Sequence, residues 1–199
     1  MAIKTAAKKP KRDQIPSRDR ILTTASELFY RDGIRGVGLE AVAAGAMTNK
    51  ASIYRHFNSR DELITEWLRS LMEQTLDFWS QIEASAPDNP GKQLDLWLNA
   101  MIMTMSQTGS RGCPFANTAV ELPDFNHPAR SVIADYKAAQ REHLARLCRK
   151  MNLIDPEIIG DGIFFILEGG QVMAQAMEPT QVAERVKRAV TALLAQANG

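Results

Sequence analysis

Residues 39–57 constrain the fold of this chain most, because their sequence, LEAVAAGAMTNKASIYRHF, reads as two short helices separated by a tight break. In the second half Asn49 is a good N-cap, and Ile53 and Phe57 share one face of the helix that follows it. In the first half, four apolar residues recur at positions i, i+3, i+4 and i+7 of one helical face, namely Leu39, Val42, Ala43 and Ala46. The pattern predicts a helix-turn-helix with residues 47–48 in the turn.

The face of the second helix opposite its buried stripe is rich in hydrogen-bond donors. In a helix-turn-helix the second helix enters the major groove by its N-terminal end, while hydroxyls and cations along its side reach phosphates. The alternative is a solvated helix face without a nucleic-acid partner. On the first interpretation we expect these DNA-binding residues: Asn49, Lys50, Ala51, Ser52, Tyr54, Arg55, His56 and Arg60.

The flanking segments predict two further helices. Ahead of the motif, an apolar stripe runs along SRDRILTTASELFYRDGIRG and stops at Gly33, a natural helix terminator, so a helix is expected to cover the other two. After the motif, Ser59 lies three residues before Glu62, which predicts a capping box that starts a new helix. The free amides at the start of that helix can hold a phosphate.

This order of a helix, a helix-turn-helix, Tyr-x-x-Phe and a capped long helix resembles the N-terminal domain of the tetracycline-repressor (TetR) family. The resemblance spans about residues 17–66 and departs from the family at two positions. Gly38 stands where the family usually has a capping hydroxyl residue, so no side chain is available there for a phosphate contact. Met47 stands where the family has a turn glycine, so it must avoid a positive φ or accept strain. The matching positions are Ala25, Leu28, Phe29, Gly33, Val42, Ala43, Ala46, Ile53, Tyr54, Phe57, Ser59 and Leu63.

Composition is that of an ordinary soluble protein, with 199 residues of which 45% are hydrophobic. No apolar run approaches the length of a membrane span, and the first residues are rich in Lys and Ala without a signal-peptide core, so we expect a cytoplasmic protein. Cys113 and Cys148 lie far apart without ligand-spaced partners, which argues against a disulfide framework, a zinc site or any other metal, and no cofactor is expected. The expected organisation is a disordered basic arm at 1–16, a DNA-binding domain at 17–60 and a helical effector-binding and dimerisation domain at 61–199.

Charge is distributed unevenly along the chain although the net charge is only +1. Residues 1–60 carry 12 Lys and Arg against 5 Asp and Glu, and the remaining residues carry 12 against 18. A basic domain is steered toward a polyanion while an acidic remainder is kept away from it. The split therefore favours double-stranded DNA as a partner, although composition alone can produce such a split by chance.

Beyond Ser59 the pattern is helical throughout, with Pro and Gly clusters as punctuation and no alternating strand pattern. The fold class is therefore all-α. A long helix that can link the two domains is expected from Ser59 to about Ala86. The helices after it are expected at about 92–108, 114–122, 129–151, 156–177 and 179–196.

The last two expected helices, 156–177 and 179–196, are apolar over wide faces. The TetR resemblance implies that they form a four-helix bundle with a second subunit, and two recognition helices on a dyad would read a palindromic operator. The alternative is that they only close the core of the monomer. Gly169 and Gly170 in mid-helix allow another helix or a ligand to approach closely. The homodimer interface is expected to include Phe165, Val186, Val190 and Leu193.

The second domain is rich in large deformable side chains, which suit an apolar effector pocket but also suit a plain core. The resemblance implies a pocket for a small apolar or aromatic molecule. The expected lining residues are Trp67, Trp97, Met101, Met105, Cys113, Phe115, Phe164 and Met173.

Three functional classes compete. The first is a dimeric transcriptional repressor released from its operator by that small-molecule effector. The second is a redox or electrophile switch through Cys113. Its segment resembles a Gly-Cys…Glu segment in one branch of the family, which would place the thiol at a helix N-terminus. The alternative is that Cys113 is a small buried cysteine. The third is an enzyme built from Cys113, Glu121 and His127, which no nucleophile motif, phosphate-binding loop or metal cluster supports. We expect the first.

Overall fold

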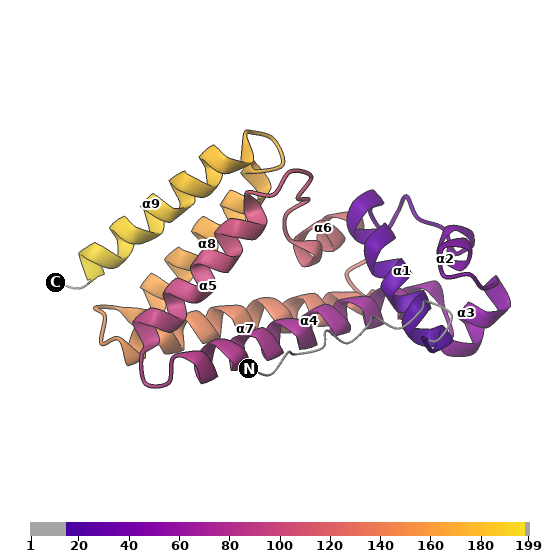
Figure 1. The fold of residues 1–199 in the computed structure, drawn as a ribbon, viewed down its shortest axis with the longest axis horizontal. Helices are drawn as coiled ribbons and strands as arrows, with labels where there is room; N and C mark the ends of the chain where they lie inside the picture. Colours follow the sequence, from indigo (N-terminus) through magenta and orange to yellow (C-terminus); the bar gives the residue numbers. More distant parts are fainter. Residues whose placement is uncertain (1–14, 198–199) are drawn as a thin grey trace, which may run out of the picture. The chain divides into compact units, whose positions relative to one another are not determined.

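The computed structural model describes residues 15–197, and within that range the chain forms nine α-helices and no strand (Figure 1). This confirms the all-α fold class. The expected basic arm lies largely outside the described residues. The helices are α1 (Ser17–Asp32), α2 (Leu39–Gly45), α3 (Lys50–His56), α4 (Arg60–Ser85), α5 (Pro90–Met105), α6 (Pro114–Glu121), α7 (Ala129–Lys150), α8 (Pro156–Met173) and α9 (Pro179–Ala197).

The chain divides into two compact units, residues 1–67 and 68–199, and the division falls inside α4. The sequence places this boundary at residue 60 instead. The first two turns of α4 belong to the N-terminal unit because Trp67 is buried there. Its ring lies 5.4 Å from that of Phe29, and its indole N–H donates to Ser26 Oγ at 3.0 Å.

The N-terminal unit is a small three-helix core completed by the start of α4. Its buried side chains are those of the predicted stripes, among them Ile21, Val42 and Ile53, which are fully buried. A Cβ at Gly45 would lie 2.7 Å from Thr24 Cγ2, so a glycine is needed where α2 passes this close to α1. The helices are short, and their stability comes from this packing rather than from propensity.

The C-terminal unit is built on α8, which lies against both α7 and α9, with α5 beside α9 (Figure 1). Glycines allow both approaches. A Cβ at Gly160 would lie 2.9 Å from the backbone nitrogen of Ala145 in α7, and one at Gly170 would lie 2.4 Å from Val186 Cγ2 in α9. Gly170 is therefore explained within the subunit, because any side chain would push α9 away.

Three helix ends differ from the sequence expectation: α5 ends at Met105 rather than near residue 108, and the other two differences have a local cause. Helix α8 ends at Met173 rather than near Met177, because residues 175 and 176 donate to carbonyls only three residues back and tighten the chain into turns. Helix α5 begins at Pro90, where the Asn89 side chain caps it by accepting from the amide of Lys92. Within the described residues no helix is long and apolar enough to cross a membrane.

Candidate nucleic-acid interface

The start of α3 is fixed by its cap, as the sequence predicts. Asn49 has an extended backbone, and its side-chain oxygen accepts from the amide of Ser52 at 2.8 Å. The turn before it is made by Met47, whose φ of 51° is a left-handed conformation. Of the two possibilities for Met47, avoiding a positive φ or accepting strain, the structure therefore has the second. The Met47 side chain is exposed, and its backbone amide donates to Ala44 O at 3.1 Å.

Five of the eight expected DNA-binding residues lie exposed on α3. Tyr54 is 49% exposed despite its large ring. The opposite face of α3 is buried through Ile53 and followed by the buried Phe57. A donor-rich face is therefore available to a partner: Lys50, Ala51, Tyr54, Arg55 and His56.

Three of the expected contact residues make hydrogen bonds within the N-terminal unit. The expectation that Ser52 is exposed to DNA is wrong. Ser52 is 3% exposed, and its hydroxyl lies 3.3 Å from that of Ser17 in α1. The guanidinium of Arg60 donates to the carbonyls of Ile34 and Val37, so it ties the loop between α1 and α2 to the start of α4. Asn49 already uses its side-chain oxygen as the cap. A helical wheel cannot show this, because α1 and the loop determine how wide the buried stripe is.

Lys50 has a partner that the sequence did not suggest. Its ammonium donates to Glu40 Oε1 at 2.5 Å, and both side chains are mostly exposed. The hydrogen bond from Lys50 lowers the pKa of Glu40, and the carboxylate raises the pKa of Lys50. Both groups therefore stay ionised around neutral pH, and the exposed face carries a carboxylate beside its leading cation.

The predicted capping box at the start of α4 forms with one difference. Ser59 Oγ accepts from the amide of Glu62 at 3.0 Å, as expected. The Glu62 carboxylate accepts from the backbone amide and side-chain amide of Asn58, each at 2.8 Å, rather than from the amide of Ser59. The Glu62 carboxylate thus lies at the N-terminus of α4, next to Asn58.

The residues expected to line an effector pocket do not all come together. Trp67 belongs to the core of the N-terminal unit. Trp97 stacks on Trp79 with ring centroids 5.0 Å apart and joins Met105 and Phe164 in the buried core, with Met101 packed against it. Met173 lines a groove of about 250 Å³ between α8 and α9. The sequence identified large apolar residues correctly but could not separate core from cavity.

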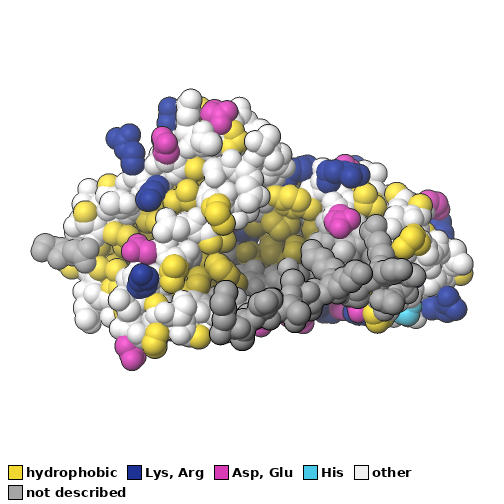
Figure 2. Space-filling model, in the orientation of Figure 1, with side chains coloured by type: hydrophobic (Ala, Val, Ile, Leu, Met, Phe, Trp, Pro, Cys, Tyr) yellow, Lys and Arg dark blue, Asp and Glu magenta, His cyan; other side chains and the backbone are white. Residues whose placement is uncertain are grey.

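A larger groove, of about 440 Å³, lies between α4 and α5 and was not anticipated. It is lined mainly by apolar side chains, and Figure 2 shows hydrophobic side chains gathered over α5. On α5 these residues occupy a different face from Trp97 and Met105. They recur at helical spacing, but the sequence pattern does not distinguish them from a second core stripe. The lining residues are Phe78, Gln81, Ile82, Ser85, Leu96, Asn99, Ala100 and Met103.

For two of the expected dimer-interface residues, the expectation that they lie on the subunit surface is wrong. Val186 and Val190 are 5% and 0% exposed, because α9 turns this stripe onto α5 and α8 of its own subunit, and Leu193 is packed against the same core. Phe165, in contrast, is 63% exposed. It shares its face of α8 with two residues at seven-residue spacing that sequence reasoning missed, Ile158 and Val172, both also exposed.

Cys113, Phe115 and Phe164 meet in a cluster around Lys137. The Lys137 ammonium lies 3.2 Å from Cys113 Sγ and 2.6 Å from Glu168 Oε1. It also lies 5.6 Å from the centre of the Phe164 ring. Cys113 is the N-cap residue of α6, as the sequence predicts, and it is buried.

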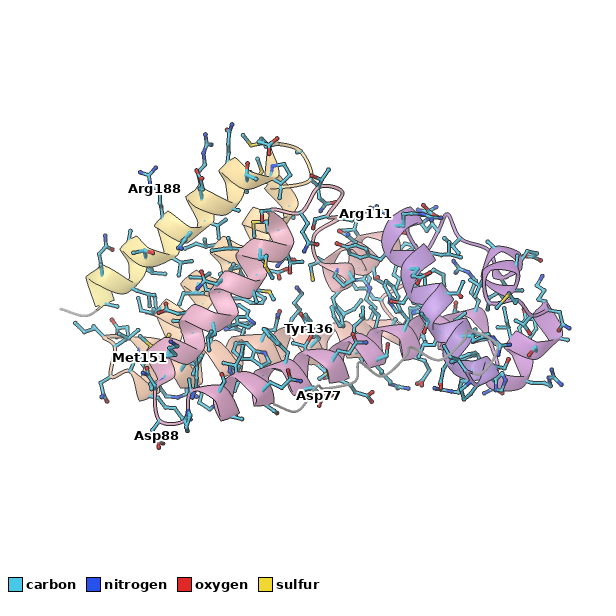
Figure 3. All side chains as sticks on the ribbon, viewed as in Figure 1. Asp77, Asp88, Arg111, Tyr136, Met151 and Arg188 are labelled. Carbon is cyan, nitrogen blue, oxygen red and sulfur yellow. The ribbon has the colours of Figure 1, made fainter. Side chains whose placement is uncertain are left out.

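Tyr136 forms a wall of this cluster and lies in the interior of the C-terminal unit (Figure 3). Its ring stacks on Phe115 with centroids 3.6 Å apart. Burial is the main cause that raises the pKa of its hydroxyl, with the nearby Cys113 adding to the shift. The described residues contain no group of three or more His, Cys, Asp or Glu side chains placed to hold a metal ion.

Comparisons with known proteins agree with this geometry. Residues 21–66 match the family model for bacterial regulatory proteins of the tetR family. An HTH-type transcriptional regulator of Bacillus subtilis, YxaF, is 26% identical over 169 residues, which cover 79% of this chain and 84% of that protein. The HTH-type transcriptional repressor DhaR of a Mycobacterium species is 26% identical over 58% of this chain and 57% of its own.

A solved structure shows the same fold over nearly the whole chain. The TetR-family regulator SCO4454 of Streptomyces coelicolor superposes with a TM-score of 0.85 at 24% identity, covering 92% of this chain and 96% of that one. The family model covers the helix-turn-helix and its capped exit, and the fold match extends through the C-terminal helices. Residues 21–66 are therefore similar to the helix-turn-helix domain of tetR-family regulators, the relatives are HTH-type transcriptional regulators, and the chain shares the fold of a TetR-family regulator.

Proposed function

We propose that the protein is a homodimeric repressor that binds a palindromic operator through α3 and leaves it when a small apolar or aromatic molecule binds the C-terminal unit. The observation that carries the DNA-binding part is the exposed face of α3. Tyr54 and Arg55 are exposed there, and Lys50 lies at the N-terminal end, which enters the groove in this motif. The repressor DhaR among the relatives supports the direction of regulation.

The stripe of Ile158, Phe165 and Val172 supports the dimer. Three large apolar side chains in line on one helix face are costly to leave in water, and a second α8 related by a dyad would cover them with the same stripe. Gly169 fits this role, because a Cβ there would meet nothing within 4 Å in its own subunit. Two recognition helices on a dyad then reach half-sites about 35 Å apart.

The groove between α4 and α5 supports effector binding. Its volume of about 440 Å³ and its apolar walls suit a small hydrophobic molecule. Helix α4 runs through both units, so a ligand that displaces its C-terminal half acts on a helix whose first turns are bound to α1 of the N-terminal unit through Trp67. Coupling of about 1 to 3 kcal/mol is enough for a useful switch, and by linkage the operator weakens effector binding by the same factor.

The test of the proposal starts from a pool of random-sequence DNA duplexes, from which the wild-type protein selects its preferred site. The expected product is an inverted repeat. In an anisotropy titration on that site, Arg55→Ala and Lys50→Ala weaken binding, whereas Arg188→Ala, which removes a cation from the outward side of α9 (Figure 3), does not. Unchanged binding by both α3 variants, or a selected site without a repeat, would reject the proposal.

A second candidate function, a switch operated by electrophiles, is favoured by one observation, the Lys137 ammonium 3.2 Å from Cys113 Sγ. Cysteines that react with electrophiles commonly have a cation beside the sulfur, and this cation is also paired with Glu168. The thiolate would add to the double bond of an acceptor such as N-ethylmaleimide, forming a thioether while the adjacent carbon takes a proton. Cys148 is expected to react more slowly, because it is 0% exposed whereas Cys113 is 6% exposed, and because burial raises the pKa of Cys148 to about 11.

The test of the second candidate compares wild type with Cys113→Ala. N-ethylmaleimide is expected to abolish operator binding by wild type and to leave Cys113→Ala unaffected, with mass spectrometry locating one adduct on Cys113. Equal loss of binding in both proteins would exclude Cys113 as the switch.

A further inference from the structure

Glu40 places a negative charge on the surface that is proposed to contact the negatively charged phosphates of DNA. It lies on the first turn of α2, is 73% exposed, and holds Lys50 Nζ at 2.5 Å. A Cβ at Gly38 would lie 3.3 Å from Glu40 Oε2, a close contact that a small shift of this exposed side chain would relieve. The chain therefore combines an absent side chain at position 38 with an acid at position 40 and a cation at position 50.

The ion pair itself adds little to folding, because exposed ion pairs contribute little to stability, and Asn49 rather than Lys50 caps α3. Glu40 lies in the first turn of α2, where Gly38 offers no side-chain cap, and a carboxylate there is favourable with or without Lys50. Both partners stay ionised at neutral pH, as their shifted pKa values indicate. The consequence of the pair is therefore to be sought in DNA binding.

We propose that Glu40 is a specificity-determining residue, which limits binding to non-operator DNA by competing with phosphates for the Lys50 ammonium. This inference rests on the proposed placement of α3 in the major groove. A lysine that is free adds a phosphate contact on any sequence, and each such contact steepens the salt dependence by about 0.9. A lysine that is paired with a carboxylate contributes less to DNA affinity on every sequence.

The geometry leaves Lys50 able to act at a base. An ammonium has three N–H donors, so Lys50 can give one to Glu40 and another to an acceptor on a base edge. Glu40 then holds the side chain at the N-terminal end of α3, where that helix approaches the bases. On non-operator DNA, where Lys50 makes no base contact, binding is weakened more than on the operator. The ratio of operator affinity to non-operator affinity therefore increases.

The experiment measures binding to a 30-base-pair duplex of mixed sequence at several salt concentrations, using the full chain. Glu40→Gln keeps the size of the side chain and removes the charge. The expected result is binding about two- to five-fold tighter at low salt, the range in which exposed pairs act, with a salt slope steeper by about 0.9 per subunit. Glu27→Gln removes an equal charge from the exposed surface of α1 and is expected to change neither quantity.

A double-mutant cycle with Lys50→Ala separates competition from simple repulsion. If Glu40 acts through Lys50, Glu40→Gln has little effect in the Lys50→Ala background. An equal gain in both backgrounds would overturn the proposal, because the carboxylate would then only repel phosphates. No gain from Glu40→Gln, in a protein that Lys50→Ala weakens, would overturn it while leaving the proposed function intact. If Lys50→Ala and Arg55→Ala both left mixed-sequence binding unchanged, the placement of α3 itself would fail.

Discussion

The indole N–H of Trp67 donates to the hydroxyl of Ser26 at 3.0 Å, which fastens α4 to α1 at the last residue of the N-terminal unit. Trp67→Phe keeps an aromatic ring but leaves a smaller one and frees the hydroxyl. We expect a loss of about 1 kcal/mol from the hydrogen bond, plus a packing loss, in urea unfolding. Ser26→Ala supplies the other edge of a double-mutant cycle, and additive effects would show that the bond contributes nothing.

Met47→Gly is expected to stabilise the protein. Met47 holds a left-handed conformation at φ 51° that glycine adopts without steric cost, and its exposed side chain gives up little packing. The gain is expected to be about 1 kcal/mol, reduced by the greater freedom of glycine in the unfolded chain. Thermal unfolding of wild type and variant measures it. A lower melting temperature would mean that the Met47 side chain packs more strongly than its exposure suggests.

Phe165→Glu is expected to convert the proposed dimer to a folded monomer, because it places a charge in the exposed stripe of α8. Val120→Glu, which alters an apolar residue of α6 that is 87% exposed, is the matched control and is expected to leave the dimer intact. Sedimentation reports the mass of each variant. A Phe165→Glu protein that stays dimeric would place the interface elsewhere.

Val190→Glu is expected to act on the subunit itself. Val190 is fully buried in the core shared by α5, α8 and α9, so an unpaired carboxylate there disrupts folding rather than only association. Circular dichroism and thermal unfolding distinguish this from the behaviour of Phe165→Glu. A Val190→Glu monomer with wild-type stability would contradict the burial of this stripe within the subunit.

His143 is expected to make stability depend on pH in the acid range. Burial is the main cause that lowers its pKa to about 3, with the charges of Arg146 and Lys150 adding to the shift. The unfolded chain binds a proton at this side chain below about pH 6.5, whereas the folded chain does not until about pH 3. The free energy of unfolding therefore falls as the pH drops through this window, by at most about 1.4 kcal/mol per pH unit.

The variant His143→Gln isolates this effect. It cannot take up the proton, so its free energy of unfolding is expected to vary less between pH 6.5 and pH 4 than that of wild type. Carboxylates with lowered pKa values, such as Asp161 beside Arg141, lose stabilisation at lower pH in both proteins and cancel in the comparison. Parallel pH profiles for the two proteins would show that His143 is not responsible.

The sequence predicted the elements of this protein well because their signals are local. Asn49 and Ser59 act on amides within three residues, and the stripe through Val42 follows from helical periodicity alone. The site was predicted less completely because accessibility is a tertiary property. Ser52 is buried by α1, Val190 is covered by helices of its own subunit, and Lys50 is engaged by an acid ten residues away on another helix. No periodicity shows which neighbour covers a face.

The contact between Ser17 and Ser52 bears on attempts to retarget this regulator. Because the hydroxyl of Ser52 faces α1, α3 cannot rotate about its axis without breaking the packing of Ile53 and the following Phe57. A library that seeks new operator sequences should therefore hold these positions constant. Its diversity belongs at the residues that face outward, Lys50, Ala51, Tyr54 and Arg55, with Glu40 varied alongside Lys50 because the two side chains act as a pair.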